Sequence, residues 1–368
     1  MAKQGIAVAS GIIISVVLVV ALSLPEDTSK NFDSVKIVEN LPITGPGSGI
    51  GIENRDGLQL AVNEINSSGG INGKQIDLII KDNETNLEKA KEIFLETEQT
   101  HDPLFHVSAL SFVSTGLGEI AEENQILLVA LSAVAPEVTQ DREWVFRYFA
   151  MADEESIPIL QTLEKLNVKN LGILYLDDEF GRSIANAVAT KFEHSVTKEP
   201  FDPNSNDFKE NIAKLQNEEA IFIVAFPDYI EIILKQLREA NYQGDILTSS
   251  DGATFEIFAM PESDGVYLGA PIVYNSNFQQ SAQIGLAYEK EYDKGLDRNA
   301  ANGYDIIRIL YATLDGDEVS QKNLKDKLNS GFTYSGIFGT IEVLPKEHDL
   351  QFKLFPAKII NGEIEFEQ

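Results

Sequence analysis

The sequence contains no cysteine, and it has only four histidines in 368 residues. The absence of cysteine excludes disulfide bonds, thiolate catalysis, cysteine-ligated zinc and a lipid anchor attached through a cysteine. Neither a G-x-S-x-G nucleophile elbow nor an H-E-x-x-H zinc helix is present. The histidines share no spacing typical of a metal site; they are His101, His106, His194 and His348. We therefore expect a protein that is not an enzyme, with no bound metal and no cofactor.

Basic residues are also scarce. The chain has 29 lysines and arginines against 58 acidic residues, which gives a net charge of −29. Nucleic acids and anionic lipid surfaces are bound through basic faces, so we exclude both as partners. The acidic excess favours solubility, but it identifies no ligand. Hydrophobic residues make up 43% of the chain, enough for a large core, and the length suggests two domains.

The chain has one long hydrophobic run, from Gly5 to Leu24, which follows Lys3. About 20 uncharged residues can cross a hydrocarbon core, whereas the apolar region of a secretory signal usually has about 7–15. We therefore expect residues 1–32 to be an N-terminal transmembrane helix, or signal, plus a polar linker. Cleavage near Ala21-Leu22-Ser23 is the alternative, which would make the protein secreted or periplasmic. In both cases the remaining chain lies on the extracellular face of the membrane.

The most informative stretch runs from Asp56 to Asp82. It opens with an apolar stripe at helical spacing, formed by Leu58, Ala61, Val62 and Ile65. Gly69-Gly70 then predicts a helix end, and residues 76–82 predict a buried strand. Upstream, residues 35–44 predict another strand, closed by a glycine-rich turn at residues 45–49. A strand, a loop, a helix and a strand in this order predict a right-handed parallel crossover.

Helices and strands continue to alternate along the rest of the chain. The strands are continuous apolar runs, which is typical of parallel strands covered on both faces. We expect further helices at residues 87–98, 115–124, 157–166, 180–192, 208–215, 229–240, 279–292, 300–314 and 321–328. We expect further strands at residues 104–110, 126–131, 145–149, 171–176, 220–226, 246–249, 266–270, 341–344 and 352–360. The fold class is therefore α/β.

Residues 56–74 read D-G-x-x-L-A-V-x-E-I-N-x-x-G-G-I-N-G-K. This run resembles the signature of the periplasmic leucine/isoleucine/valine-binding proteins, the type I solute-binding proteins of ABC importers. The resemblance implies two Rossmann-like lobes with parallel sheets joined by a multi-strand hinge. It implies that lobe 1 comprises residues 33–149 and 273–340, and lobe 2 residues 150–272 and 341–368. It also implies a small organic ligand and an ABC permease as partners.

Candidate ligand-binding residues lie where the predicted strands end, because open parallel sheets bind ligands beyond the carboxyl ends of their strands. Ser111, Ser114 and Thr115 fall in a loop, residues 111–116, at the start of a predicted helix. Their hydroxyls could receive a carboxylate or could simply cap the helix. The resemblance favours the first role, since this loop holds the ligand carboxylate in amino-acid-binding members.

The resemblance implies further site residues on other loops. Ser132 and Ala133 lie on a loop that faces the ligand, and Asp251 corresponds to the acidic residue that meets a ligand ammonium group. The alternative for Asp251 is an ordinary turn aspartate before a glycine.

The site also departs from the family pattern. Val134 stands where amino-acid binders carry threonine, Phe180 and Phe226 stand where they carry tyrosine, and Ile50 replaces another aromatic residue. The pocket is therefore expected to be more apolar than one built for a free zwitterion, unless the phenylalanines only pack the core. A branched-chain amino acid, an amide, a small aromatic acid and an amine held mainly by Asp251 all stay open as ligands. A ligand-sensing receptor ectodomain of the same fold is the alternative function.

Overall fold

The structure is a computed structural model that describes residues 34–367. The expected N-terminal transmembrane helix lies outside the described residues. Within residues 34–367, every helix is too short or too polar to cross a membrane. The described strands form two sheets and one separate hairpin, β11 (Phe332–Gly336) with β12 (Gly339–Val343).

The first sheet has the strand order β13-β5-β4-β3-β1-β2, and all its pairings are parallel. Its strands are β1 (Val35–Leu41), β2 (Ile76–Asp82), β3 (Phe105–Ala109), β4 (Leu128–Leu131), β5 (Val145–Tyr148) and β13 (Asp349–Leu350). Strand β1 pairs with β2 in parallel, and helix α1 (Ser48–Ser67) connects them. The predicted crossover is therefore confirmed.

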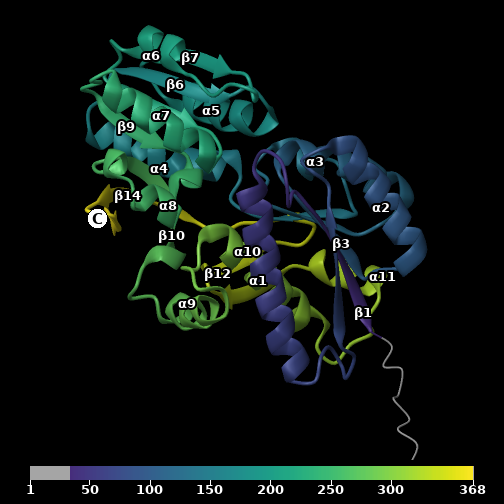
Figure 1. Cartoon of the computed structure of the whole chain (residues 1–368). Helices are drawn as coiled ribbons and strands as arrows, with labels where there is room; N and C mark the ends of the chain where they lie inside the picture. Colours follow the sequence, from purple (N-terminus) through teal and green to yellow (C-terminus); the bar gives the residue numbers. More distant parts are fainter. Residues whose placement is uncertain (1–33, 368) are drawn as a thin grey trace, which may run out of the picture. The chain divides into compact units, whose positions relative to one another are not determined.

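Helices cover both faces of the first sheet. Helix α1 packs against α10 (Arg298–Leu314), as Figure 1 shows, and α2 (Leu87–His101) packs against α3 (Ser111–Asn124). Strand β4 contributes Val129 and Leu131 to the core under α1, and Leu128 and Ala130 to the core under α2 and α3. This alternation explains why β4 is apolar throughout. Helix α11 (Gln321–Leu328) packs beside α10.

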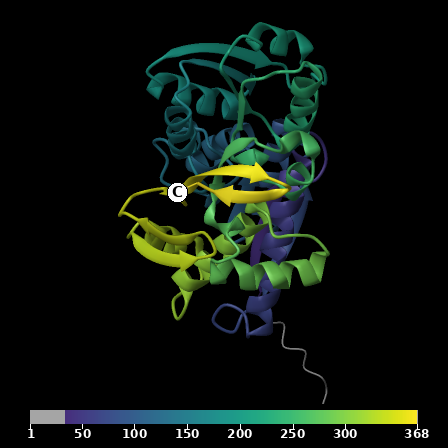
Figure 2. The same ribbon diagram turned by 90° about the vertical axis from the view of Figure 1, so that its left-hand side faces the viewer.

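The second sheet has the order β15-β14-β10-β9-β8-β6-β7. Its strands are β6 (Asn170–Leu176), β7 (Ser195–Phe201), β8 (Ala220–Val224), β9 (Asp245–Thr248), β10 (Tyr267–Pro271), β14 (Leu354–Ile360) and β15 (Glu363–Phe366). The first five are parallel, whereas β14 pairs antiparallel with β10 and with β15. Figure 2 shows the β14–β15 hairpin in yellow. The remaining helices are α4 (Ala152–Lys165), α5 (Glu179–Lys191), α6 (Lys209–Leu215), α7 (Pro227–Glu239), α8 (Phe255–Phe258) and α9 (Gln279–Tyr292).

The chain passes between the sheets at separate points of the sequence. It leaves the first sheet after Tyr148, returns after Pro271 and leaves again between Leu350 and Leu354. The last crossing is fixed by two pairings, since β13 joins β5 in the first sheet and β14 joins β10 in the second. The division into lobes at the residues given above stays a prediction.

Two segments that the sequence analysis describes as turn or loop are helical. Helix α1 begins at Ser48, after Gly47 with φ 76°, so the expected turn at residues 45–49 is shorter than predicted. Helix α3 begins at Ser111, so the expected loop at residues 111–116 is wrong. In both cases the first helical turn is rich in glycine or serine. These residues have modest helix propensity, which tertiary packing overrides here.

Candidate functional site

A cavity of about 220 Å³ lies between segments that follow strands of both sheets. Helix α1 and the turn before it supply one wall, and α7 together with the start of α8 supplies the other. The charged residues among those that line the cavity are all acidic. The lining residues are Gly47, Gly49, Ile50, Glu53, Pro227, Asp228, Glu231, Thr254 and Glu256.

The predicted serines of α3 bond to neighbouring parts of the first sheet. The Ser111 hydroxyl oxygen accepts from the backbone N–H groups of Val134 (3.1 Å) and Ala135 (3.3 Å). The Ser114 hydroxyl lies 2.9 Å from that of Ser108 on β3. Both serines are buried; Ser111 joins the start of α3 to the loop after β4, and Ser114 joins α3 to β3.

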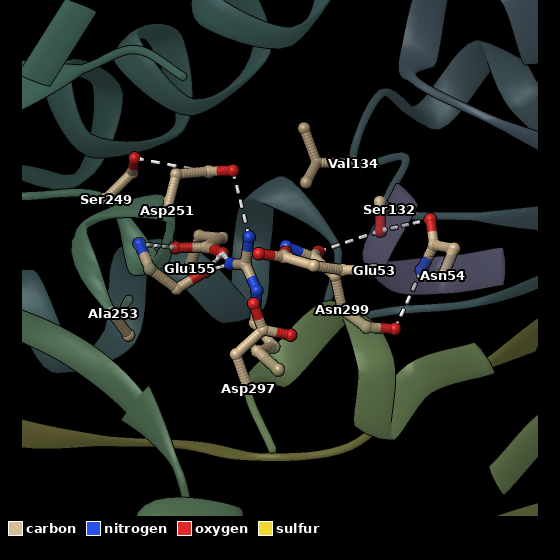
Figure 3. A network of polar contacts seen from close by, with 12 residues as sticks. Glu53, Asn54, Ser132, Val134, Glu155, Ser249, Asp251, Ala253, Asp297 and Asn299 are labelled. Carbon is tan, nitrogen blue, oxygen red and sulfur yellow. Dashed lines mark hydrogen bonds and ion pairs between the residues drawn. The ribbon is translucent and has the colours of Figure 1, made fainter. Parts of the chain in front are cut away.

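The loop after β4 is held by asparagines from two helices. The Ser132 hydroxyl lies 3.2 Å from Oδ1 of Asn54 and 3.0 Å from Oδ1 of Asn299, and it can donate to one of them at a time (Figure 3). Asn54 in turn donates to the backbone carbonyl of Asn299 at 2.8 Å. Ala133 and Val134 follow in this loop and are fully buried. The loop is therefore fixed against α1 and α10.

The two predicted phenylalanines touch each other in the second sheet's part of the molecule. Phe180 lies in the first turn of α5 and Phe226 precedes α7; their ring centroids lie 5.1 Å apart. A methyl group placed on Gly47 would meet the Phe226 ring at 3.6 Å and the Leu110 side chain at 3.5 Å. Phe226 thus packs close to the turn that leads into α1, at the edge of the cavity.

Asp251, which follows β9 of the second sheet, lies against an arginine from α10. Arg298, the first residue of α10, donates through Nη2 to Oδ1 of Asp251 at 2.9 Å. Its Nη1 contacts the Ser250 hydroxyl and lies 3.7 Å from Oε1 of Glu155. The guanidinium carbon lies 4.8 Å from the centre of the Phe149 ring. Arg298 is only 2% exposed, so Asp251 meets a cation that the chain itself supplies.

Two further carboxyl groups of this network are strongly affected by burial (Figure 3). Glu155 accepts from the backbone N–H of Ser250 at 3.1 Å, yet burial raises its pKa to about 7. Burial, and next the neighbouring carboxylate of Asp297, raise the pKa of Glu53 well above its ordinary value. Asn299 donates to Glu53 at 2.9 Å. At neutral pH Glu155 is therefore close to half-protonated, and burial shifts Glu53 toward its protonated form.

Residues that the sequence analysis missed complete this network. They are Glu53, Asn54, Glu155, Asp297, Arg298 and Asn299. One local signal was available, because Asp297 caps α10 by accepting from the backbone N–H of Ala300 at 2.8 Å. That signal marks a helix start, and it does not reveal the partner of Arg298. Among residues 34–367, no group of three or more potential metal ligands is found.

A family profile described as periplasmic binding protein matches residues 34–363. The chain belongs to the periplasmic binding protein family. Among curated relatives, the leucine-, isoleucine-, valine-, threonine- and alanine-binding protein of Pseudomonas aeruginosa is 25% identical over 274 residues, or 71% of this chain and 73% of the relative. The chemotactic signal transduction system substrate-binding protein BasB of Halobacterium salinarum is 24% identical over 247 residues. That alignment covers 62% of this chain and 58% of the relative.

Solved structures agree on the fold of this periplasmic binding protein. The branched-chain amino acid transporter substrate binding protein LivJ from Streptococcus pneumoniae, in complex with isoleucine, gives a TM-score of 0.82 at 21% identity. The alignment covers 90% of this chain and 98% of LivJ. An ABC transporter solute binding protein from R. palustris, in complex with benzoate, gives a TM-score of 0.84 at 18% identity. The alignment covers 90% of this chain and 95% of that protein. The resemblance to type I periplasmic binding proteins is therefore confirmed.

Proposed function

We propose that this periplasmic binding protein captures a small organic ligand between two lobes and delivers it to an ABC importer. The observation that carries the proposal is the cavity whose walls come from segments following strands of both sheets. A ligand held there would contact both walls at once. It would therefore bind the closed arrangement of the lobes more tightly than an open one and shift the population toward closure.

The proposed lobes are those of the sequence analysis, each built around one sheet. The crossings after Tyr148, after Pro271 and between Leu350 and Leu354 would serve as the hinge. Such connecting segments can absorb backbone rotations while the sheets stay rigid. We place the ligand against the loops that carry Ser132 and Val134 on one side and Phe226 and Asp251 on the other. The N-terminal segment would tether the protein to the outer face of the membrane.

A binding test with the purified chain would decide the proposal. Native mass spectrometry would identify any co-purifying small molecule, and a thermal-shift screen of amino acids, amides, amines and aromatic acids would follow. A ligand that binds only the native state at 100 times its Kd stabilises the protein by about 2.7 kcal/mol. The same ligand should reduce the radius of gyration measured by small-angle X-ray scattering. A chain that neither retains nor responds to any of these compounds would contradict the proposal.

Two glycines offer a matched pair of variants for this test. Gly49 lines the cavity and Gly285 lies on α9, and each has open space where a Cβ would be. Gly49→Trp should abolish the ligand-dependent shift by filling the cavity. Gly285→Trp should keep it, because it adds the same side chain away from the cavity.

Ligand sensing is the second candidate function. It is favoured by the similarity to the chemotactic signal transduction system substrate-binding protein BasB. Co-purification of the membrane-embedded chain with either an importer or a signalling receptor would distinguish the two roles.

A further inference from the structure

Arg298 joins parts of the chain that belong to different sheets. It is the first residue of α10, which packs against α1 beside the first sheet. Its partners belong to the second sheet, since Ser250 and Asp251 follow β9, and Glu155 lies on α4, which packs against β10 and β14. The contacts of this one guanidinium group therefore cross from one sheet to the other (Figure 3).

The ion pair at this crossing is buried on both sides. Arg298 Nη2 lies 2.9 Å from Oδ1 of Asp251, and both side chains are buried. The guanidinium carbon lies 4.8 Å from the centre of the Phe149 ring, so the ring face also stabilises the positive charge. If the two halves separated, water would reach both charges. While the halves are together, each charge depends on the other for compensation.

This burial makes the closed arrangement sensitive to the loss of either partner. Without Arg298, closure would bury the Asp251 carboxylate with the Ser249 hydroxyl, at 3.3 Å, as its remaining side-chain donor among the described residues. Breaking a buried ion pair from one side is strongly unfavourable, whereas replacing both charges by neutral groups is often close to neutral. Removing one charge should therefore oppose closure, and removing both should permit it again.

We propose that Arg298 is a positioning residue whose ion pair with Asp251 locks the two lobes in the closed arrangement without requiring a ligand. The pair fixes how the two walls of the cavity face each other, so the cavity has its shape before the ligand binds. The ligand then meets a population that is already competent to bind, and the apparent affinity rises with that fraction. This inference rests on the proposed function, because it assumes that the lobes rotate about the crossings between the sheets.

The absence of cysteine allows closure to be measured directly with two spin labels. Cysteines would replace Glu92 on α2, beside the first sheet, and Thr190 on α5, beside the second (Figure 1). Both side chains are exposed. Double electron–electron resonance would be recorded on the purified full chain after dialysis to remove any retained small molecule. We expect mainly the short distance of the closed arrangement, and a distribution dominated by longer distances would overturn the inference.

Variants of the ion pair separate a positioning role from a structural one. Arg298→Met keeps the aliphatic stem, and it should raise the ratio of open to closed molecules by about tenfold or more, because it leaves a buried carboxylate unpaired. Asp251→Asn should act in the same direction, and the double variant should recover the closed distance. A merely structural role would lower the melting temperature and leave the distances unchanged, which would overturn the inference.

Arg308→Met is the matched control, because Arg308 lies on the same helix and packs near Tyr311. It should leave the distances unchanged, and an opening equal to that of Arg298→Met would contradict the inference. If Arg298→Met fails to fold, Asp251→Asn tests the ion pair from the second sheet, and unchanged distances there would also overturn it. The ligand screen above decides the proposed function separately. A chain that binds a ligand but is not opened by these variants would keep the proposed function and lose the lock.

Discussion

Glu155 illustrates how burial changes the ionisation of a carboxyl group. Two bonds from Ser250 and the nearby guanidinium of Arg298 favour its charged form, but burial outweighs them and raises the pKa to about 7. In the unfolded chain the same group titrates near 4.5. The folded protein therefore holds a proton on Glu155 over a pH range in which the unfolded chain has lost it.

This difference predicts a pH dependence of stability. The contribution of Glu155 is fully present below about pH 4.5 and is lost as the pH rises toward about 7, because the unfolded chain then binds fewer protons than the folded one. The full loss in the free energy of unfolding is on the order of 3 kcal/mol. Glu155→Gln removes it, so the melting temperature of the original protein should fall relative to that of Glu155→Gln between pH 5 and pH 8, a window set by the same linkage.

The comparison with Glu155→Gln is needed because other groups titrate in this range. Burial raises the pKa of Glu39 to about 8 and that of Asp305 to about 6, and both affect the two proteins equally. If the melting temperatures of the two proteins change in parallel with pH, Glu155 is ionised in the folded state at every pH tested. That result would contradict the prediction.

Individual residues show which parts of the candidate site could be predicted from the sequence. The family pattern pointed to Ser111 and Asp251, and the structure buries both; neither is among the residues that line the cavity. Their roles as ligand contacts stay predictions. Their observed partners, Val134 and Arg298, lie 23 and 47 residues away in the chain. Such pairings depend on how loops from different strands meet, and no local pattern encodes that.

At the scale of elements, the contact between α1 and α10 depends on two glycines. A Cβ on Gly57 would lie 1.8 Å from the backbone oxygen of Ala300, and one on Gly303 would lie 2.2 Å from that of Asn54. The helix backbones can therefore approach closely only because these side chains are absent. Asn54 lies on α1 and Arg298 lies on α10, so the positions of both side chains depend on this contact.

Gly57→Ala should consequently be strongly destabilising. The added methyl group must push the two helices apart, and overpacking of this kind costs about 1–3 kcal/mol or more. Gly285→Ala on α9 is the matched control, since nothing lies within 4 Å of its Cβ position. That change should stabilise the protein by up to about 1 kcal/mol through helix propensity. Urea unfolding of both variants would measure the difference, and equal stabilities would contradict the close-contact interpretation.

One strand of the second sheet was not predicted from the sequence, and its position explains why. Strand β7 was missed because its residues, Ser195 to Phe201, include several charged and polar side chains. It pairs only with β6 at the edge of the sheet, where one side of the strand faces away from any neighbour. Edge strands do not need the continuous apolar run by which the central strands were recognised. The apolar central strands, such as β8, were predicted correctly.

For the whole molecule, the dominant electrostatic feature is the net charge of −29. Folding brings these charges closer together, so their mutual repulsion opposes the compact state. Added salt screens charges separated by more than a Debye length, which falls from about 10 Å at 0.1 M to about 3 Å at 1 M. The melting temperature should therefore rise by several degrees over this range of sodium chloride, as differential scanning calorimetry would measure. A flat or falling curve would mean that attractive ion pairs outweigh the repulsion.

The sequence by itself determined the α/β class, the first parallel crossover and the membership of the periplasmic binding protein family. These features depend on local periodicity, on glycines at fixed offsets and on an uninterrupted motif from Asp56 to Lys74. Only the tertiary structure decided that β14 and β15 close the second sheet antiparallel and that Arg298 neutralises Asp251. The reason is physical: a local pattern fixes which face of an element is buried. The partner of a buried charge is fixed only when distant elements pack together.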